Sequence, residues 1–163
     1  MLKWSWLSLA VIVLDQITKY LASSMLVLYK PIAVMPMFNI TLMHNTGAAF
    51  SFLSDAGGWQ RWFFTAIALT VSTFLFFWLK RLSAHEKLQA VALALILGGA
   101  IGNVIDRIWF GYVVDFIQVY YQQWYWPAFN IADSAITIGA VLIIIDTIKT
   151  SRSTDKQQTD SAR

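Results

Sequence analysis

The sequence predicts an all-α membrane protein built as a bundle of four membrane-spanning helices. Of the 163 residues, 58% are hydrophobic and only 13% are charged, and the mean hydropathy is +0.58. An average soluble domain has about 45–50% apolar and about 25% charged residues. Four stretches reach the length of about 20 mostly apolar residues that a spanning helix needs. They cover residues 4–22, 59–79, 88–109 and 130–149.

The two ends of the chain need separate interpretation. The first stretch resembles a secretory leader because Lys3 precedes an apolar run, but Asp15 and Lys19 interrupt that run. No small-x-small cleavage site follows, so we expect a retained span. The tail at 150–163 is rich in Ser, Thr, Gln and Asp, and we expect it to be disordered. Residues 1–149 then form a single membrane-embedded domain.

The distribution of basic residues predicts the orientation in the membrane. Eight of the twelve Lys and Arg residues lie at the N-terminus, between the second and third spans, or at and after the end of the fourth. The opposite side holds only Lys30, Arg61 and Arg107. The positive-inside rule therefore places both termini in the cytoplasm and segments 23–58 and 110–129 outside. No Lys/Arg run exceeds two residues, which argues against a nucleic-acid binder.

The two outward segments have patterns of their own. Apolar and polar side chains alternate over Phe38–Met43, which is the period of a half-buried strand. Asn45–Gly47 then predicts a turn. The second segment carries YYQQWYWP at 120–127, an aromatic cluster suited to the headgroup level of a membrane. Together these segments are expected to cover the outer ends of the spans.

Charged residues inside the spans need partners, because an unpaired charge at the bilayer centre is costly. Asp15 and Lys19 lie four residues apart and so share one helical face. Asp106 and Arg107 follow GGAIG at 98–102, whose small residues allow close helix approach. We expect these charges to pair with one another, Asp15 with Lys19 and Asp106 with Arg107, and to fix helix packing.

Two carboxylates have no basic partner near them in the sequence. Asp115 sits in the apolar stretch GYVVDFI, and Asp133 lies in the first turn of the fourth span. Both fall near the outer surface, where two such acids make sense structurally only if they face each other. Repulsion then makes the pair share one proton, so one carboxyl is an acid and the other a base at the same pH. That is the chemistry of an aspartic protease.

Other catalytic chemistries find less support. Ser23 follows Lys19 by four residues, so a Ser/Lys pair is sterically possible, but no second feature supports it. His44 and His85 fall on opposite sides of the membrane in this topology, and no H-E-x-x-H is present, which disfavours a zinc protease. The sequence contains no Cys, which excludes thiol nucleophiles and thiolate metal sites.

Four blocks taken together resemble the bacterial lipoprotein signal peptidases, the signal peptidase II family. The blocks are DQITK at 15–19, NTGAAFSFL at 45–53, GGAIGNVIDRIWFGYVVDFI at 98–117 and FNIADSAI at 129–136. The resemblance implies an aspartic intramembrane endopeptidase of the bacterial inner membrane with its active site near the periplasmic side. It would cleave the signal peptide from diacylglyceryl-modified prolipoproteins, on the N-terminal side of the lipidated cysteine.

The resemblance also implies the site residues and the partners. The family's catalytic dyad falls on Asp115 and Asp133, and its supporting positions fall on Asp15, Lys19, Asn45, Gly47, Asn103, Arg107 and Asn130. The outward segments would be an extracytoplasmic β-cradle and a periplasmic aromatic loop or helix. Membrane lipids and globomycin-type inhibitors are the implied partners, with no metal and no cofactor. Small residues at Gly99, Gly102, Ala132 and Ala135 would leave room for the substrate's side chains.

Two other classes of protein also place acids within a membrane. A small transporter uses such acids along an ion pathway, but usually shows internal repeats or broken helices at the midplane, and this sequence shows neither. A non-catalytic scaffold would use its polar residues only for helix contacts. Asp→Asn changes at 115 and 133 separate the three, since only a peptidase would stop producing a cut peptide.

Overall fold

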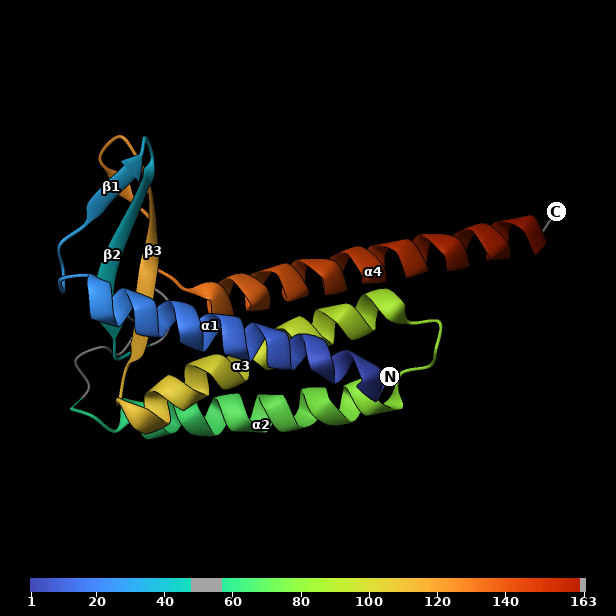
Figure 1. Ribbon diagram of the computed structural model, residues 1–163. Coiled ribbons are helices and arrows are strands. Elements are labelled where there is room, and N and C mark those ends of the chain that lie inside the picture. The colour runs from blue at the N-terminus through green and yellow to red at the C-terminus, as the bar shows by residue number, and fades with distance from the viewer. Residues whose placement is uncertain (48–56, 162–163) are drawn as a thin grey trace.

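The computed structural model describes residues 1–47 and 57–161 and has four long helices (Figure 1). A 3-10 turn, η1 (Leu2–Trp4), leads into α1 (Ser5–Met25), and the other helices are α2 (Gln60–Arg81), α3 (Lys87–Trp109) and α4 (Ile131–Ser161). The first three begin and end within three residues of the stretches expected from hydropathy. Apolar length alone was therefore a sufficient signal for these helices.

A four-stranded antiparallel sheet stands at one end of the helices, where a β-cradle was expected, so the description all-α is imprecise (Figure 1). Its strands are β1 (Ile32–Met35), β2 (Phe38–Asn45), β3 (Val113–Tyr121) and β4 (Trp124–Tyr125), in that order across the sheet. The aromatic segment forms the tip of the β3–β4 hairpin, with Tyr121 paired to Trp124, in place of the expected loop or helix. Aromatic residues favour the pleated conformation, and five of the eight residues at 120–127 are aromatic.

The strand expected around Phe38–Met43 is confirmed as β2, but its buried face is polar. Asn39 and Thr41 are buried, whereas Phe38 and Ile40 are only half-buried. The Asn39 amide donates to Gln118 Oε1 on β3 at 3.2 Å, which satisfies part of this polar face. The first half of β2 therefore turns Asn39 and Thr41 inward and leaves Phe38 and Ile40 partly exposed.

Helix α3 is central and packs against each of the other three helices. It is mostly buried, whereas α2 and α4 are mostly exposed along equally apolar segments. By length and hydropathy, α2, α3 and the Ile131–Ser151 part of α4 can cross a membrane. α1 falls short of that measure because Asp15, Gln16 and Lys19 interrupt its apolar run. The expected four-span bundle is thus supported for three helices.

Glycines set the close approach of the helices, as expected. A Cβ at Gly98 would lie 2.8 Å from Ser8 O on α1, and one at Gly102 would lie 2.7 Å from Asp15 Oδ2. Gly99 meets Ala132 on α4 in the same way. Neighbouring helices therefore occupy the space beside these glycines, and the idea that Gly99 and Gly102 leave room for substrate side chains is wrong.

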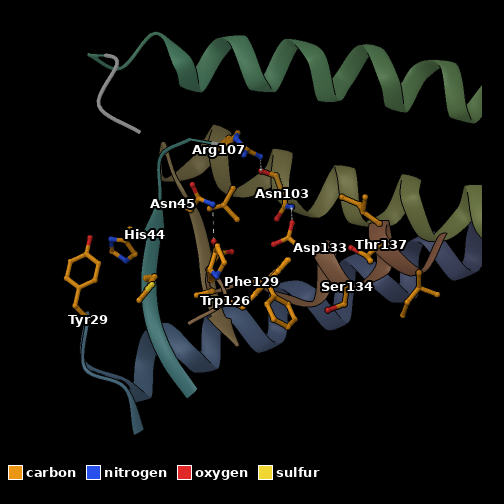
Figure 2. Close-up of a pocket in the computed structure, with 17 residues that line it drawn as sticks. Tyr29, His44, Asn45, Asn103, Arg107, Trp126, Phe129, Asp133, Ser134 and Thr137 are labelled. Carbon is orange, nitrogen blue, oxygen red and sulfur yellow. Dashed lines mark hydrogen bonds between the residues drawn. The ribbon is translucent and has the colours of Figure 1, made fainter. Parts of the chain in front are cut away.

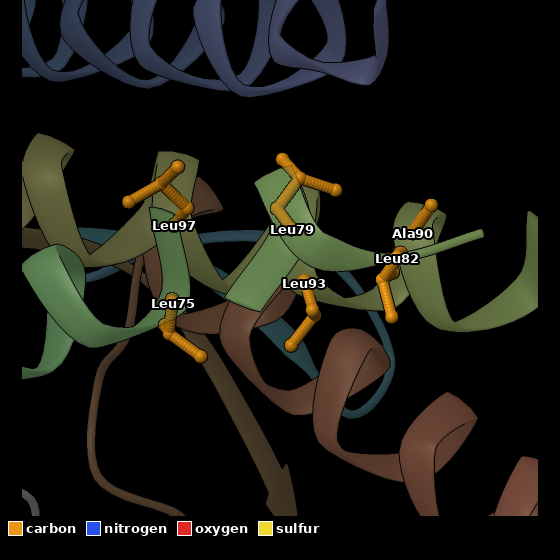
Figure 3. Close-up of a cluster of buried hydrophobic side chains, with 6 residues drawn as sticks. All are labelled: Leu75, Leu79, Leu82, Ala90, Leu93 and Leu97. Carbon is orange, nitrogen blue, oxygen red and sulfur yellow. The ribbon is translucent and has the colours of Figure 1, made fainter. Parts of the chain in front are cut away.

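A leucine-rich cluster joins α2 to α3 at the end of the bundle away from the sheet (Figure 3). It consists of Leu75, Leu79, Leu82, Ala90, Leu93 and Leu97. Leu79 and Leu93 are fully buried. Burial of side chains of this size contributes about 1.5–3 kcal/mol each. The cluster therefore anchors α2, whose main helix partner is α3.

The last helix is longer than its apolar stretch. α4 continues through Ser161 and so includes most of the tail that the sequence alone predicts to be disordered. No Gly or Pro follows Gly139, so no residue type that breaks a helix interrupts the backbone there. Both chain termini lie at the end of the bundle away from the sheet (Figure 1).

Gly139 provides a test of the close α3–α4 packing. A Cβ there would lie 2.6 Å from Ile96 Cγ1 and 2.7 Å from the backbone oxygen of Ala92. We expect Gly139→Val to lower the free energy of unfolding by about 1–3 kcal/mol, the usual cost of overpacking. Thermal unfolding in detergent measures this. Ala140→Val, on the exposed side of the same helix, is the control, and an equal loss there would contradict the packing explanation.

Candidate active site

A cavity of about 850 Å³ lies where the sheet meets α3 and α4. Asp115 on β3 and Asp133 on α4 both line it, together with Asn45 and Asn103. Figure 2 shows Tyr29 and His44 towards one end of the cavity and Ser134 and Thr137 towards the other, with Asn45 and Asp133 between them. The two acids isolated in the sequence therefore share one enclosure.

Asp115 is held by two amide donors. It is 2% exposed, and its two oxygens accept hydrogen bonds from Asn45 Nδ2 at 3.0 Å and Asn130 Nδ2 at 2.7 Å. Burial, together with the charge of Asp133, raises the pKa of Asp115 to about 7, although both amides oppose the rise. A proton therefore stays on this carboxyl close to neutral pH.

Asp133 belongs to the first turn of α4. Its Oδ1 accepts a hydrogen bond from Asn103 Nδ2 at 2.8 Å, and its Oδ2 accepts one from the backbone N–H of Asn130 at 3.3 Å. The backbone N–H of Asp133 donates in return to Asn130 Oδ1 at 2.9 Å. This reciprocal pair is the capping-box arrangement at a helix start, and the positive end of the helix dipole favours a negative charge there.

Asn130 joins the two acids directly. Its side-chain amide donates to Asp115, and its backbone N–H donates to Asp133. The same amide also lies 3.2 Å from Asn103 Oδ1 and 3.3 Å from the backbone oxygen of Val114. Asn130 is fully buried, so a single residue binds both carboxylates, one through its side chain and the other through its backbone.

Lys19 pairs with two buried acids, which we call the Lys19 cluster: Lys19, Asp15 and Asp106. Lys19 Nζ lies 2.8 Å from Asp15 Oδ2 and 2.9 Å from Asp106 Oδ2. It also donates to Asn103 Oδ1 at 2.9 Å. The expected Asp15–Lys19 pair is confirmed. Because Asn103 in turn binds Asp133, the cluster reaches the cavity through one side chain.

The expected Asp106–Arg107 pair is wrong. Neighbouring residues on a helix do not face each other, and Asp106 turns towards Lys19 instead. Arg107 donates to the backbone oxygen of Gly47 at 3.0 Å and to that of Asn103 at 3.4 Å. Arg107 thereby ties α3 to the turn after β2, where Gly47 N donates to Asn45 Oδ1 as the predicted turn requires.

All nine residues that the sequence singled out fall into one hydrogen-bonded network. They are Asp15, Lys19, Asn45, Gly47, Asn103, Arg107, Asp115, Asn130 and Asp133. Residues 48–53 of the NTGAAFSFL block lie outside the described residues. The charged groups facing the dyad include Lys19 and Arg107, so the acids without a basic neighbour in the sequence have two in space.

Several residues in and around the cavity were not predicted from the sequence. Gln16 donates to Asp106 Oδ1 at 2.9 Å, and Tyr29, His44 and Trp126 line the cavity. The His44 ring stacks on Tyr112 with centroids 3.8 Å apart, and burial lowers the pKa of His44. In the sequence, only their position in or near the four blocks that resemble the family could have indicated them. Among the described residues, no group of three His, Asp or Glu side chains could hold a metal ion.

Comparisons with known proteins agree on one family. The family model described as signal peptidase (SPase) II matches residues 7–149. A lipoprotein signal peptidase of Acinetobacter baumannii is 61% identical over 144 residues, covering 88% of this chain and 82% of that protein. One of Pseudomonas putida is 57% identical over 156 residues, covering 94% and 91%.

Solved structures support the same relationship. A bacterial membrane enzyme aligns with a TM-score of 0.82 at 35% sequence identity, covering 91% of this chain and 89% of the other. A second bacterial membrane enzyme structure gives a TM-score of 0.77, also at 35% identity. The arrangement of helices and a small sheet is therefore shared with membrane enzymes over nearly the whole length.

The Lys19 cluster generates a prediction about stability. Lys19→Met leaves the carboxylates of Asp15 and Asp106 buried without their shared cation, and breaking a buried ion pair on one side costs about 3–5 kcal/mol. We expect a large fall in the thermal unfolding temperature in detergent. Lys30→Met, at an exposed position, should leave that temperature nearly unchanged. A melting curve like that of the wild type for Lys19→Met would show that the cluster contributes little.

Proposed function

Since the chain belongs to the signal peptidase II family, we propose that it cleaves signal peptides from prolipoproteins by aspartic catalysis, with Asp115 and Asp133 as the two catalytic carboxylates. The observation that carries this proposal is the placement of both acids in one cavity, joined by Asn130. Paired carboxyls with different surroundings are the arrangement from which one acid and one base arise at the same pH.

The chemistry follows from one proton shared by the pair. The ionised carboxylate takes a proton from water as the water oxygen attacks the scissile carbonyl carbon, while the protonated carboxyl donates a hydrogen bond to the carbonyl oxygen. The tetrahedral intermediate then collapses as the amide nitrogen receives a proton and the C–N bond breaks. Asp133, at the start of α4, is suited to the ionised role, and the raised pKa of Asp115 suits it to carry the proton.

Polar neighbours of the dyad are suited to bind the substrate's main chain. Arg107 lines the cavity while its guanidinium holds the Gly47 carbonyl, so an extended peptide beside Asn45 would lie within reach of this cation. Asn45 both orients Asp115 and closes the turn at Gly47. Asn103 also lines the cavity, and the fully buried Asn130 donates a hydrogen bond to it. We assign these residues to orientation of the peptide bond and of the dyad.

The distribution of basic and aromatic residues supports one orientation in a bacterial inner membrane. Exposed tryptophans occur at both ends of the helices: Trp59 begins α2 and Trp109 ends α3 near the sheet, whereas Trp6 lies near the N-terminus. Tryptophan favours the membrane–water boundary. With the basic residues concentrated at the end holding the termini, both termini lie in the cytoplasm and the dyad lies near the periplasmic side.

This placement fits a lipidated substrate. Acyl chains hold a diacylglyceryl-modified prolipoprotein in the membrane, so its scissile bond on the N-terminal side of the lipidated cysteine lies close to the boundary. The cavity combines the dyad with apolar residues of α4, Ile136 and Ile138. Surrounding lipids and a globomycin-type cyclic peptide are the further partners that we propose for this surface.

Isosteric changes test the dyad. Asp115→Asn and Asp133→Asn keep the shape of each side chain but remove the acid or base, and general acid–base catalysis contributes about 10²–10⁴-fold. We expect each variant to melt near the wild-type temperature and to cleave a diacylglyceryl-modified prolipoprotein peptide about 10³-fold more slowly. Asp146→Asn, which changes an acid far along α4, serves as the control. A comparable cleavage rate in either dyad variant would rule out the assignment.

The raised pKa of Asp115 predicts the alkaline limit of activity. The dyad needs one proton, and Asp115 loses its proton as pH rises through about 7, so cleavage should fall above that pH. Asn45 donates to the carboxylate and so favours its ionised form. Asn45→Ala should therefore raise the pKa of Asp115 and shift the alkaline limb of the kcat profile to higher pH. A limb unmoved or shifted to lower pH would contradict this role for Asn45.

A further inference from the structure

The two acids of the Lys19 cluster bind the backbone beside the two catalytic residues. Asp106 Oδ2 accepts a hydrogen bond from the backbone N–H of Val114 at 3.0 Å. Asp15 Oδ1 accepts one from the backbone N–H of Ala132 at 2.9 Å. Val114 directly precedes Asp115, and Ala132 directly precedes Asp133. The residue before each catalytic residue thus donates its backbone N–H to one acid of the cluster.

Lys19 connects the two acids that accept these hydrogen bonds. Asp106 lies on α3 and binds β3, whereas Asp15 lies on α1 and binds the start of α4. Lys19 Nζ lies within 2.9 Å of an oxygen on each acid. The four elements α1, α3, β3 and α4 therefore converge on one ammonium, and the separation of β3 from α4 at the dyad depends on it.

Helix packing alone does not explain this arrangement. The side chains of Asp15, Asp106 and Lys19 are nearly inaccessible to solvent, and apolar residues of similar size often stabilise such a site equally well or better. Backbone N–H groups at Val114 and Ala132 need acceptors, and carboxylates supply strong ones. The charges are thus placed where they act on the dyad's backbone.

The cluster also sets the field at the dyad. Lys19 and Arg107 are the positive groups facing Asp115 and Asp133, and the negative groups are Asp15 and Asp106. The charge of Lys19 favours the ionised form of Asp115 and so opposes the rise in its pKa. Removal of the Lys19 charge therefore raises the pKa of Asp115, whereas removal of the charge of Asp15 or Asp106 lowers it.

We propose that Asp15, Asp106 and Lys19 are positioning residues that hold the two catalytic carboxylates at their working separation through the backbone of Val114 and Ala132. This inference rests on the proposed function, because it assigns the cluster a part in aspartic catalysis. The cluster touches no reacting atom and is expected to govern kcat while leaving substrate binding unchanged.

Two substitutions at Asp106 distinguish the loss of its hydrogen-bond acceptor from the loss of its charge. Asp106→Leu removes the acceptor for Val114, whereas Asp106→Asn retains a carbonyl oxygen that can accept the same bond. Misplacement of a reacting group by about 1 Å costs about 100-fold in rate. We expect Asp106→Leu to lower kcat by about that factor with KM nearly unchanged, and Asp106→Asn to recover most of kcat. Asp15→Leu and Asp15→Asn should behave in the same way through Ala132.

The pH profile of kcat distinguishes a role at the dyad from a role in folding alone, because a role in folding alone would leave the alkaline limb in place. Asp106→Asn leaves the charge of Lys19 less neutralised, so the alkaline limb should shift to lower pH. Lys19→Met removes the positive charge, so the limb should shift to higher pH. If Lys19→Met does not fold, the pH profile of kcat for Asp106→Asn tests the inference by itself. Lys30→Met is the charge control and should leave the limb in place.

The outcomes separate this inference from the proposed function. A folded Asp106→Leu with the wild-type kcat, or with a raised KM and unchanged kcat, would overturn the positioning role. So would an alkaline limb unmoved in Asp106→Asn. If those results accompany inactive Asp115→Asn and Asp133→Asn variants, only the positioning role fails. If the dyad variants themselves still cleave the lipidated peptide, the proposed function fails instead.

Discussion

The ammonium of Lys19 neutralises two buried carboxylates at once, and the active end of the molecule is arranged around that contact. Removing Asp15 and Asp106 from water is unfavourable unless each finds a cation and hydrogen-bond donors. Lys19 supplies the cation, and the backbone of Val114 and Ala132 supplies donors. The same contacts join α1, α3, β3 and α4 at one point, so satisfying the buried charge also brings together the segments that carry the two acids.

Local spacing in the sequence predicted only part of this network. Asp15 and Lys19 lie four residues apart on one helix, so their pair could be predicted from helical geometry alone. The contact of Lys19 with Asp106 spans two helices and depends on how α1 crosses α3, which no local pattern specifies. Asp106 and Arg107 are adjacent in the sequence and were therefore expected to pair, but a helix directs neighbouring side chains apart. The family resemblance, by contrast, selected residues that all join one network.

The fold shows the same division between local and distant information. Apolar length predicted the helices because a run of about 20 apolar residues has few other stable conformations. The alternation at Phe38–Met43 predicted a strand but did not identify the strand's partner. β2 pairs with β3, whose residues lie more than 60 positions away, and the helices bring the two together. The polar face of β2 is buried for the same reason, since Asn39 meets Gln118 only in the assembled sheet.

The dyad is divided between two kinds of element, Asp115 on the sheet and Asp133 on a helix. The two acids therefore meet only where the sheet packs on the helices, since neither part alone carries both of them. A chain in which only one of these parts has formed holds a single acid and lacks the pair.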